Sequence, residues 1–302
     1  MITFLRFARA HTVIGTSLSL LTLYLIASRV VDAHNWTIFG VSLFSCLCAN
    51  VYITGLNQLT DIEIDRINKP YLPLASGAYS VKQGKLIVAV CGLLAVVTCW
   101  FYIPWLALTV LSSLALGTAY SAEPLRLKRY HFWAAFCIIV VRGLIVNLLL
   151  YLHFASSLVL RHTQQGAGPQ VPSEDQEVLI TGSIWALTGI IFVFGLIIAW
   201  FKDLPDTEGD AEHGIKTLSI LRSKEWVYRT GAILLGVTLL AGSGYGFLAG
   251  NFGLSAGLLV LLLGFGYNTT RLNLNEQKSI AAFYQGTWGV FFGVYLVFAV
   301  WG

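Results

Sequence analysis

Charged residues are scarce in this chain of 302 residues. They make up 11% of it, whereas apolar residues make up 56% and the mean hydropathy is +0.73. Because a soluble globular domain has roughly 25% charged residues, this composition excludes that class and predicts a membrane protein. No polar linker divides the sequence, so we expect residues 1–302 to form a single domain.

The sequence also lacks paired cysteines and a cleavable signal. The five cysteines lie in apolar stretches and form no Cys-X-X-Cys pair, so we expect small packing residues rather than a metal or redox site. The first apolar stretch lacks a cleavage pattern of small residues and is read as an anchor, not a cleavable signal. The net charge of +4 is attributed to topology and anion binding rather than to nucleic-acid binding.

Long uncharged stretches predict an all-α membrane protein with nine transmembrane helices. Such a helix needs about 20 apolar residues. Residues 86–122 are too long for one crossing, and Pro104 marks a hairpin between two. Residues 230–270 are divided in the same way at Gly250–Gly253, and residues 158–178 form a loop. The expected spans are 12–28, 35–60, two within 86–122, 132–153, 178–201, two within 230–270, and 279–302.

Basic residues are distributed unevenly between the two ends of these spans. With nine spans, the amino terminus shares one side with the loops after even-numbered spans. That side receives all but three of the 19 basic residues, the exceptions being Arg29, Arg142 and Arg161. Because cytoplasmic loops are enriched in Lys and Arg, we expect the amino terminus and the functional site on the cytoplasmic side.

The first acidic cluster follows the second span. Asn57, Asp61 and Asp65 are spaced i, i+4, i+8, which on one helix places them in a single stripe. Oxygen ligands of this kind suit Mg²⁺, which binds one or two carboxylates together with phosphate oxygens. The alternative interpretation is a cluster that caps and solvates a helix end.

The second acidic cluster follows the sixth span, on the same predicted side. Asp203, Asp206 and Asp210 are its members, and Pro205 must bend or end the helix there. Two acidic clusters in proximity repel each other unless cations lie between them. We therefore predict a metal site that holds a phosphorylated substrate at the membrane surface.

Basic residues accompany both clusters and are expected to bind a diphosphate, since cations stabilise a leaving group as its charge develops. The alternative for each is that it only marks the cytoplasmic side. The candidates, with a tyrosine that precedes the loop after span four, are Arg66, Lys69, Arg126, Lys128, Lys202 and Tyr120.

Arg142 is the one charge inside a predicted span, and Asn147 follows it. A buried arginine should face the bundle interior and a partner. Two interpretations stay open: Arg142 binds an anionic substrate group, or it pairs with an Asp of the clusters.

These motifs resemble the UbiA family of intramembrane aromatic prenyltransferases along nearly the whole chain. Asn57, Asp61 and Asp65 keep the register of that family's NDxxDxxxD motif, with Gln58 in the second position. Gln58 is typical of the homogentisate branch. Further segments similar to that branch are 9–16, 68–77, 202–210 and 214–218; the chain departs from it at Ala10 and Glu123, where proline is common.

The resemblance implies a UbiA-type bundle with a lateral, lipid-facing opening. It implies Mg²⁺-dependent transfer of a phytyl group from phytyl diphosphate to homogentisate with decarboxylation, giving methylphytylbenzoquinol for tocopherol synthesis. A cyanobacterial thylakoid or plasma membrane is implied, with the lipid bilayer and the two substrates as partners and no protein partner. The implied metal ligands are Asn57, Asp61, Asp65, Asp203, Asp206 and Asp210.

Roles follow residue by residue from the same resemblance. The residues expected to act in catalysis are Asp61, Asp65, Asp206 and Asp210. The residues expected to recognise the aromatic acid are Arg9, His11, Arg142 and Asn147.

Other functions compete with this reading. Transfer of a geranylgeranyl or solanesyl group to homogentisate, or a chlorophyll synthase, would use the same motifs. A secondary transporter would place its site near the bilayer midplane, whereas these acids lie at span ends. A non-catalytic scaffold leaves the paired acidic clusters unexplained.

Overall fold

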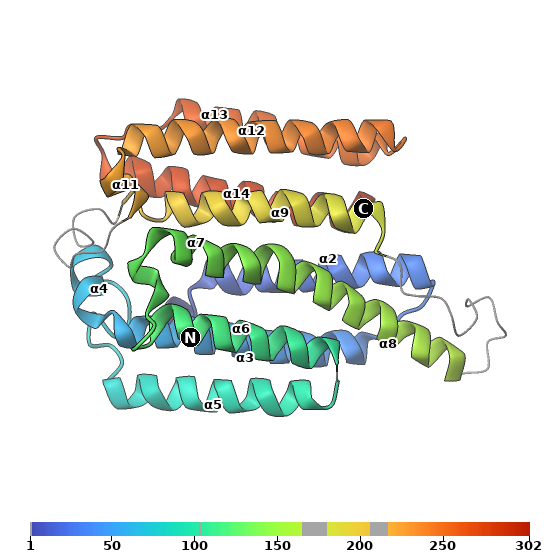
Figure 1. Ribbon diagram of the computed structural model, residues 1–302, viewed down its shortest axis with the longest axis horizontal. Helices are drawn as coiled ribbons and strands as arrows, with labels where there is room; N and C mark the ends of the chain where they lie inside the picture. Colours follow the sequence, from blue (N-terminus) through green and yellow to red (C-terminus); the bar gives the residue numbers. More distant parts are fainter. Residues whose placement is uncertain (1, 103, 165–179, 206–216) are drawn as a thin grey trace.

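The computed structural model describes residues 2–102, 104–164, 180–205 and 217–302. Long helices lie side by side and roughly parallel, with α12 and α13 at one edge of the bundle and α5 at the other (Figure 1). The helices in the first half are α1 (Ile2–Phe7), α2 (Ala10–Val31), α3 (Trp36–Thr60), α4 (Ile62–Asn68), α5 (Val81–Trp100) and α6 (Trp105–Ser121).

The second half continues the same arrangement. A short η1 (Leu127–Arg129) leads into one long helix with three parts, α7 (His131–Ile139), η2 (Val140–Leu149) and α8 (Leu150–Gln164). The remaining helices are α9 (Gly182–Phe201), α11 (Leu218–Leu221), α12 (Lys224–Leu248), α13 (Phe252–Thr270) and α14 (Gln277–Trp301).

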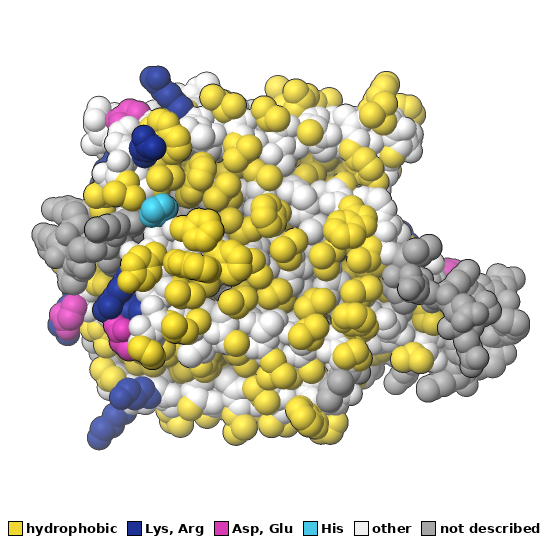
Figure 2. Space-filling model, in the orientation of Figure 1, with side chains coloured by type: hydrophobic (Ala, Val, Ile, Leu, Met, Phe, Trp, Pro, Cys, Tyr) yellow, Lys and Arg dark blue, Asp and Glu magenta, His cyan; other side chains and the backbone are white. Residues whose placement is uncertain are grey.

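Nine helical segments of the described chain are apolar enough to be membrane spans, as predicted. Eight are long enough to cross a bilayer, and α6 is a shorter apolar helix of 17 residues. On the face shown in Figure 2, apolar side chains cover the middle and Lys and Arg lie at the end that carries α4 and α11. The protein is therefore a multi-pass membrane protein.

One predicted boundary is wrong. The fifth span was expected to end at His153, but the helix continues to Gln164, so the expected loop 158–178 begins later. His153 is buried, with 2% of its surface exposed, and its Nε2 lies 2.8 Å from the hydroxyl oxygen of Ser42. A polar side chain that has a hydrogen-bond partner can be buried inside the bundle. The position of His153 in the sequence therefore does not mark the end of the membrane-spanning helix.

Small residues let the long helix and α9 approach closely. A Cβ on Gly143 would lie 2.9 Å from the backbone Cα of Phe192, and one on Gly195 would lie 3.3 Å from the Cα of Ile139. Membrane helices pack through such contacts, because lipid supplies no hydrophobic force between them. This crossing fixes the segment that carries Arg142.

The Gly143→Ala variant is expected to lower the free energy of unfolding by about 1–3 kcal/mol, because a backbone atom of α9 cannot yield space. Gly189→Ala is the matched control, since no atom lies within 4 Å of its added Cβ. Thermal unfolding midpoints in detergent measure the difference. Equal midpoints for the two variants would contradict the tight crossing.

Candidate active site

Asp61 lies at a break between two helices rather than on one. Helix α3 ends at Thr60, Asp61 takes a non-helical φ of −122°, and α4 begins at Ile62. The prediction that Asn57, Asp61 and Asp65 form a stripe on a single helix is therefore wrong. Asn57 and Asp61 still meet across the break, because the Asn57 side-chain amide donates to Asp61 Oδ2 at 3.0 Å.

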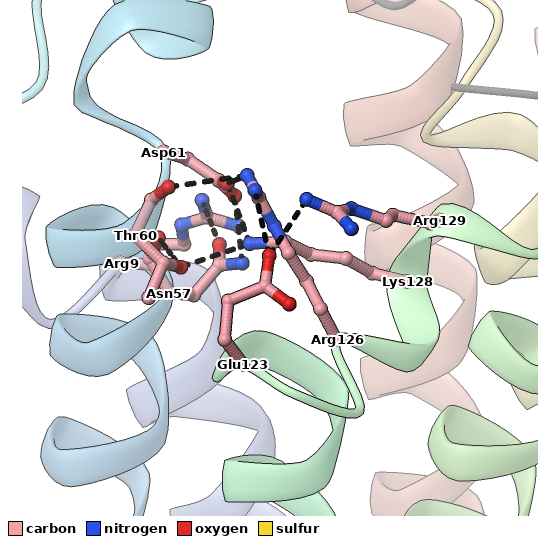
Figure 3. Close-up of polar contacts among 8 residues, drawn as sticks. All are labelled: Arg9, Asn57, Thr60, Asp61, Glu123, Arg126, Lys128 and Arg129. Atoms are coloured by element: carbon pink, nitrogen blue, oxygen red, sulfur yellow. Dashed lines mark hydrogen bonds and ion pairs between the residues drawn. The ribbon is translucent and has the colours of Figure 1, made fainter. Parts of the chain in front are cut away.

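Two cations from the loop after α6 hold the Asp61 carboxylate. Lys128 Nζ donates to Asp61 Oδ1 at 2.5 Å, and Arg126 Nη2 donates to the same oxygen at 3.2 Å (Figure 3). Lys128 and Asp61 are nearly buried, with side chains 7% and 12% exposed. Thr60 accepts from both cations, which joins the end of α3 to η1.

Burial lowers the pKa of the Lys128 amino group to about 8, although the nearby Asp61 carboxylate acts in the opposite direction. The group therefore remains protonated at neutral pH. Its positive charge also lies close enough to Asp65 for the two to interact. Lys128 thus links the two acids of the first cluster.

Arg9 approaches the cluster from the amino-terminal segment. Its Nη2 donates to Asn57 Oδ1 at 3.0 Å. Gln58 secures this segment, because its buried side chain donates to the Phe7 carbonyl at 2.6 Å. In the sequence, Gln58 was notable only because it differs from the family motif. Its hydrogen bond to Phe7 joins residues that are far apart in the chain, so motif spacing could not predict it.

Arg9 and Arg126 share two unusual features. Each has a left-handed backbone, with φ of 53° and 35°, a conformation that costs free energy for a residue other than glycine. In each, the buried Nε makes no hydrogen bond among the described residues. Such strain and unused donors beside Asp61 are typical of a site prepared for an anion.

A cavity of about 240 Å³ opens beside this cluster and runs into the bundle. Its mouth is polar, and its deeper walls are apolar, with Ile53, Val110 and Phe291 among them. The predicted residues that line it are Arg9, His11, Asn57, Tyr120, Arg142 and Lys202.

The second acidic cluster begins next to Lys202, which lines the cavity. Asp203 is 9% exposed and accepts a hydrogen bond from Lys202 Nζ at 2.5 Å. Tyr120 is close enough to Asp203, Lys202 and Asp61 for the charges of all three to act on its hydroxyl. Asp206 and Asp210 lie outside the described residues.

Three predicted residues have other surroundings. Arg66 is exposed and donates to Glu63 at 2.7 Å on the outside of α4, so it does not face the cavity. Lys69, just after α4, is near enough to His11 for its charge to act there. Asn147 is fully buried within η2 and does not line the cavity.

Among the described residues, no group of three or more acids, histidines or cysteines comes close enough together to hold a metal ion, so the set of metal ligands stays a prediction. Asn57, Asp61, Asp65 and Asp203 supply only oxygen ligands, the kind that Mg²⁺ prefers. Asp65 and Asp203 are both buried carboxylates, and buried carboxylates require nearby positive charge. A metal held by these four side chains would keep coordination positions open for phosphate oxygens.

A family model for the UbiA prenyltransferase family matches residues 17–296. The chain belongs to this family. It is 43% identical to the homogentisate phytyltransferase of Synechocystis sp. over 99% of this chain and 95% of that protein. It is 35% identical to homogentisate phytyltransferase 1 of Arabidopsis thaliana, a chloroplast protein, over 97% of this chain and 74% of the relative.

The fold of the family is confirmed by solved structures. A UbiA homologue from Archaeoglobus fulgidus, bound to GPP and Mg²⁺, superposes with a TM-score of 0.61 over 99% of both chains at 18% identity. The predicted all-α bundle of the UbiA type is therefore correct, and the protein is a prenyltransferase of this family. The lateral opening stays a prediction.

The Asp61→Asn variant is expected to lower the rate of prenyl transfer at least 100-fold, because it removes the charge that Lys128 and Arg126 surround. Glu63→Gln is the matched control, since Glu63 is exposed and its described hydrogen bonds come only from Arg66. Rates of the purified variants in Mg²⁺ buffer, compared with the unmodified protein, measure the effect. A rate for Asp61→Asn close to that of Glu63→Gln would remove Asp61 from the active site.

Proposed function

We propose that this protein transfers a phytyl group from phytyl diphosphate to homogentisate, with loss of carbon dioxide and with Mg²⁺ as cofactor. The observation that carries the proposal is the cavity itself, which joins cations at its mouth, Arg9 and Lys202, to an apolar interior, with the Asp61–Lys128 pair beside the mouth. The 43% identity to a homogentisate phytyltransferase over nearly the whole chain supports the choice of substrates.

Each part of the donor substrate has a matching part of the cavity. The diphosphate lies at the mouth, where Arg9 and Lys202 line the wall and Arg126 and Lys128 are adjacent. The isoprenoid tail lies against apolar side chains deeper in the bundle, such as Ile53, because burying apolar surface there is favourable.

Mg²⁺ would be held by Asn57, Asp61, Asp65 and Asp203, together with Asp206 and Asp210, and would neutralise the charge of the departing diphosphate. The Mg²⁺ bound by the Archaeoglobus homologue supports the use of a divalent metal by this protein. Asp61, Asp65, Asp206 and Asp210 are proposed to act in catalysis as its acidic ligands.

The protein's cations assist the first bond cleavage. As the allylic C–O bond breaks, its electron pair leaves with the diphosphate, and donors such as Lys128 and Arg126 stabilise the negative charge that develops. Apolar walls exclude water from the allylic cation. The aromatic faces of Tyr120, Tyr284 and Trp288 line the same cavity and suit a cation.

The acceptor ring then completes the reaction. A ring carbon of homogentisate forms the new C–C bond to the allylic cation, and the ring proton leaves. Cleavage of the bond to the carboxylate carbon releases carbon dioxide and leaves an electron pair on the methylene carbon. That carbon takes up a proton and becomes the methyl group of methylphytylbenzoquinol, so charge and protons balance.

Sidedness is also proposed. Arg9, Lys128 and Lys202 gather at the end of the bundle that carries most of the predicted cytoplasmic basic residues. We place the amino terminus and the active site on the cytoplasmic side of a cyanobacterial thylakoid or plasma membrane.

Purified protein with Mg²⁺, homogentisate and an equimolar mixture of phytyl, geranylgeranyl and solanesyl diphosphates is expected to give chiefly the decarboxylated phytyl product. Mass spectrometry separates the three products and shows whether carbon dioxide was lost. If the geranylgeranyl or solanesyl product dominated, the corresponding diphosphate would be the donor in place of phytyl diphosphate. The assignment of homogentisate as acceptor would be wrong if the protein made no prenylated product from homogentisate but transferred a prenyl group to a chlorophyll precursor.

A further inference from the structure

Arg142 is a charged side chain in the middle of a membrane-spanning helix. It lies in η2, within the span His131–Leu160, and lines the cavity. The sequence left open whether it pairs with an Asp of the acidic clusters. In the part of the chain that the structure describes, no ion pair joins Arg142 to a carboxylate, and no carboxylate lines the cavity beside it.

Aromatic rings surround this guanidinium instead. It lies 4.8 Å from the centre of the Trp288 ring, a cation–π contact. His11 meets the same ring edge-on at 4.8 Å between centroids, and Tyr284 lies at 6.4 Å. Trp288 is 4% exposed. Its buried indole N–H has no well-aligned hydrogen bond among the described residues, and its polar neighbour is the Tyr284 hydroxyl.

The chemistry of this corner differs from that of the cavity mouth. A guanidinium that is shielded from water is a strong donor, and its fork of N–H groups matches a carboxylate in shape. The surrounding rings suit an aromatic ring. A ligand that combines one carboxylate with an aromatic ring therefore fits here, whereas a diphosphate fits the cations at the mouth and the acids beside them.

The helix around Arg142 is held in an unusual form. Residues Val140–Leu149 are wound as a π-helix, a rare feature that occurs frequently at functional sites. Asn147 supports it, because its amide donates to the carbonyls of Arg142 and Gly143, both at 3.0 Å. Its Oδ1 accepts from the Tyr295 hydroxyl of α14 at 3.0 Å, so the buried amide is fully engaged.

We propose that Arg142, held against the Trp288 ring, binds the carboxylate of the aromatic acceptor, and that Asn147 and Tyr295 are positioning residues that orient Arg142. This assignment rests on the proposed function and adds the group of the acceptor that is recognised. Asn147 was predicted to contact the acid; it acts instead through the backbone of its own helix.

The test compares two ligands that share a ring. Homogentisate carries the carboxylate, and 2-methylhydroquinone lacks it. For Arg142→Met, the Kd of homogentisate is expected to rise about 100-fold, a loss typical of a buried charge-assisted contact, while the Kd of 2-methylhydroquinone and the KM of phytyl diphosphate stay within twofold. Titration calorimetry in detergent and steady-state kinetics measure these values.

Arg271→Met is the matched control. Arg271 also contacts an aromatic ring, that of Tyr267 at 5.1 Å, but it lies away from the cavity. Its Kd and KM values should equal those of the unmodified protein. An unchanged homogentisate Kd for Arg142→Met, in a protein that still makes the phytyl product, would overturn the carboxylate assignment and leave the proposed function standing.

Tyr295→Phe tests the positioning residues, because it deletes only the hydroxyl that holds Asn147. The KM of homogentisate should rise about fivefold to tenfold, whereas kcat and the Kd of 2-methylhydroquinone should change less than twofold. A merely structural role would weaken both ligands equally, and that result would overturn the positioning role. If the unmodified protein makes no product from homogentisate, the proposed function itself fails.

Discussion

The interaction on which the site depends is the pairing of buried charges around Asp61. A carboxylate at the end of an apolar bundle is costly unless cations accompany it. Lys128 and Arg126 supply them at 2.5 and 3.2 Å, and Asn57 adds a hydrogen bond. These contacts join the end of α3 to the loop after α6, directly beside Asn57 and Arg9, which line the cavity.

The cavity also has cations outside this pairing. Arg9 donates to Asn57 beside the Asp61 cluster, while Arg142 of η2 lies against the Trp288 ring of α14. Positive charge is therefore present both beside the Asp61 cluster and beside the Trp288 ring, and the two guanidinium groups of Arg9 and Arg142 are close enough to act on each other. Each place offers a different geometry of donors, one suited to a metal-bound diphosphate and one to a single carboxylate.

Much of this could be predicted from the sequence, because scarce charges reveal where helices leave the membrane. Uncharged stretches predicted nine membrane helices, and the two acidic clusters were predicted at the ends of two of them. The expectation that Asn57, Asp61 and Asp65 lie on one helix was wrong. The helix breaks after Thr60, and the sequence spacing of the three residues does not reveal that break. The fastening role of Gln58 and the support that Asn147 gives to η2 escaped prediction because both rest on contacts with particular backbone carbonyls.

The central claim is that the cavity mouth binds a diphosphate together with Mg²⁺. The most direct test is calorimetric titration of the purified protein with an unreactive phytyl diphosphate analogue whose bridging oxygen is replaced by sulfur. The account predicts tight binding in Mg²⁺ and at least a 100-fold higher Kd in EDTA. Equal affinity in the two buffers would contradict it, because Asp61 and its neighbours would then bind the diphosphate without a metal.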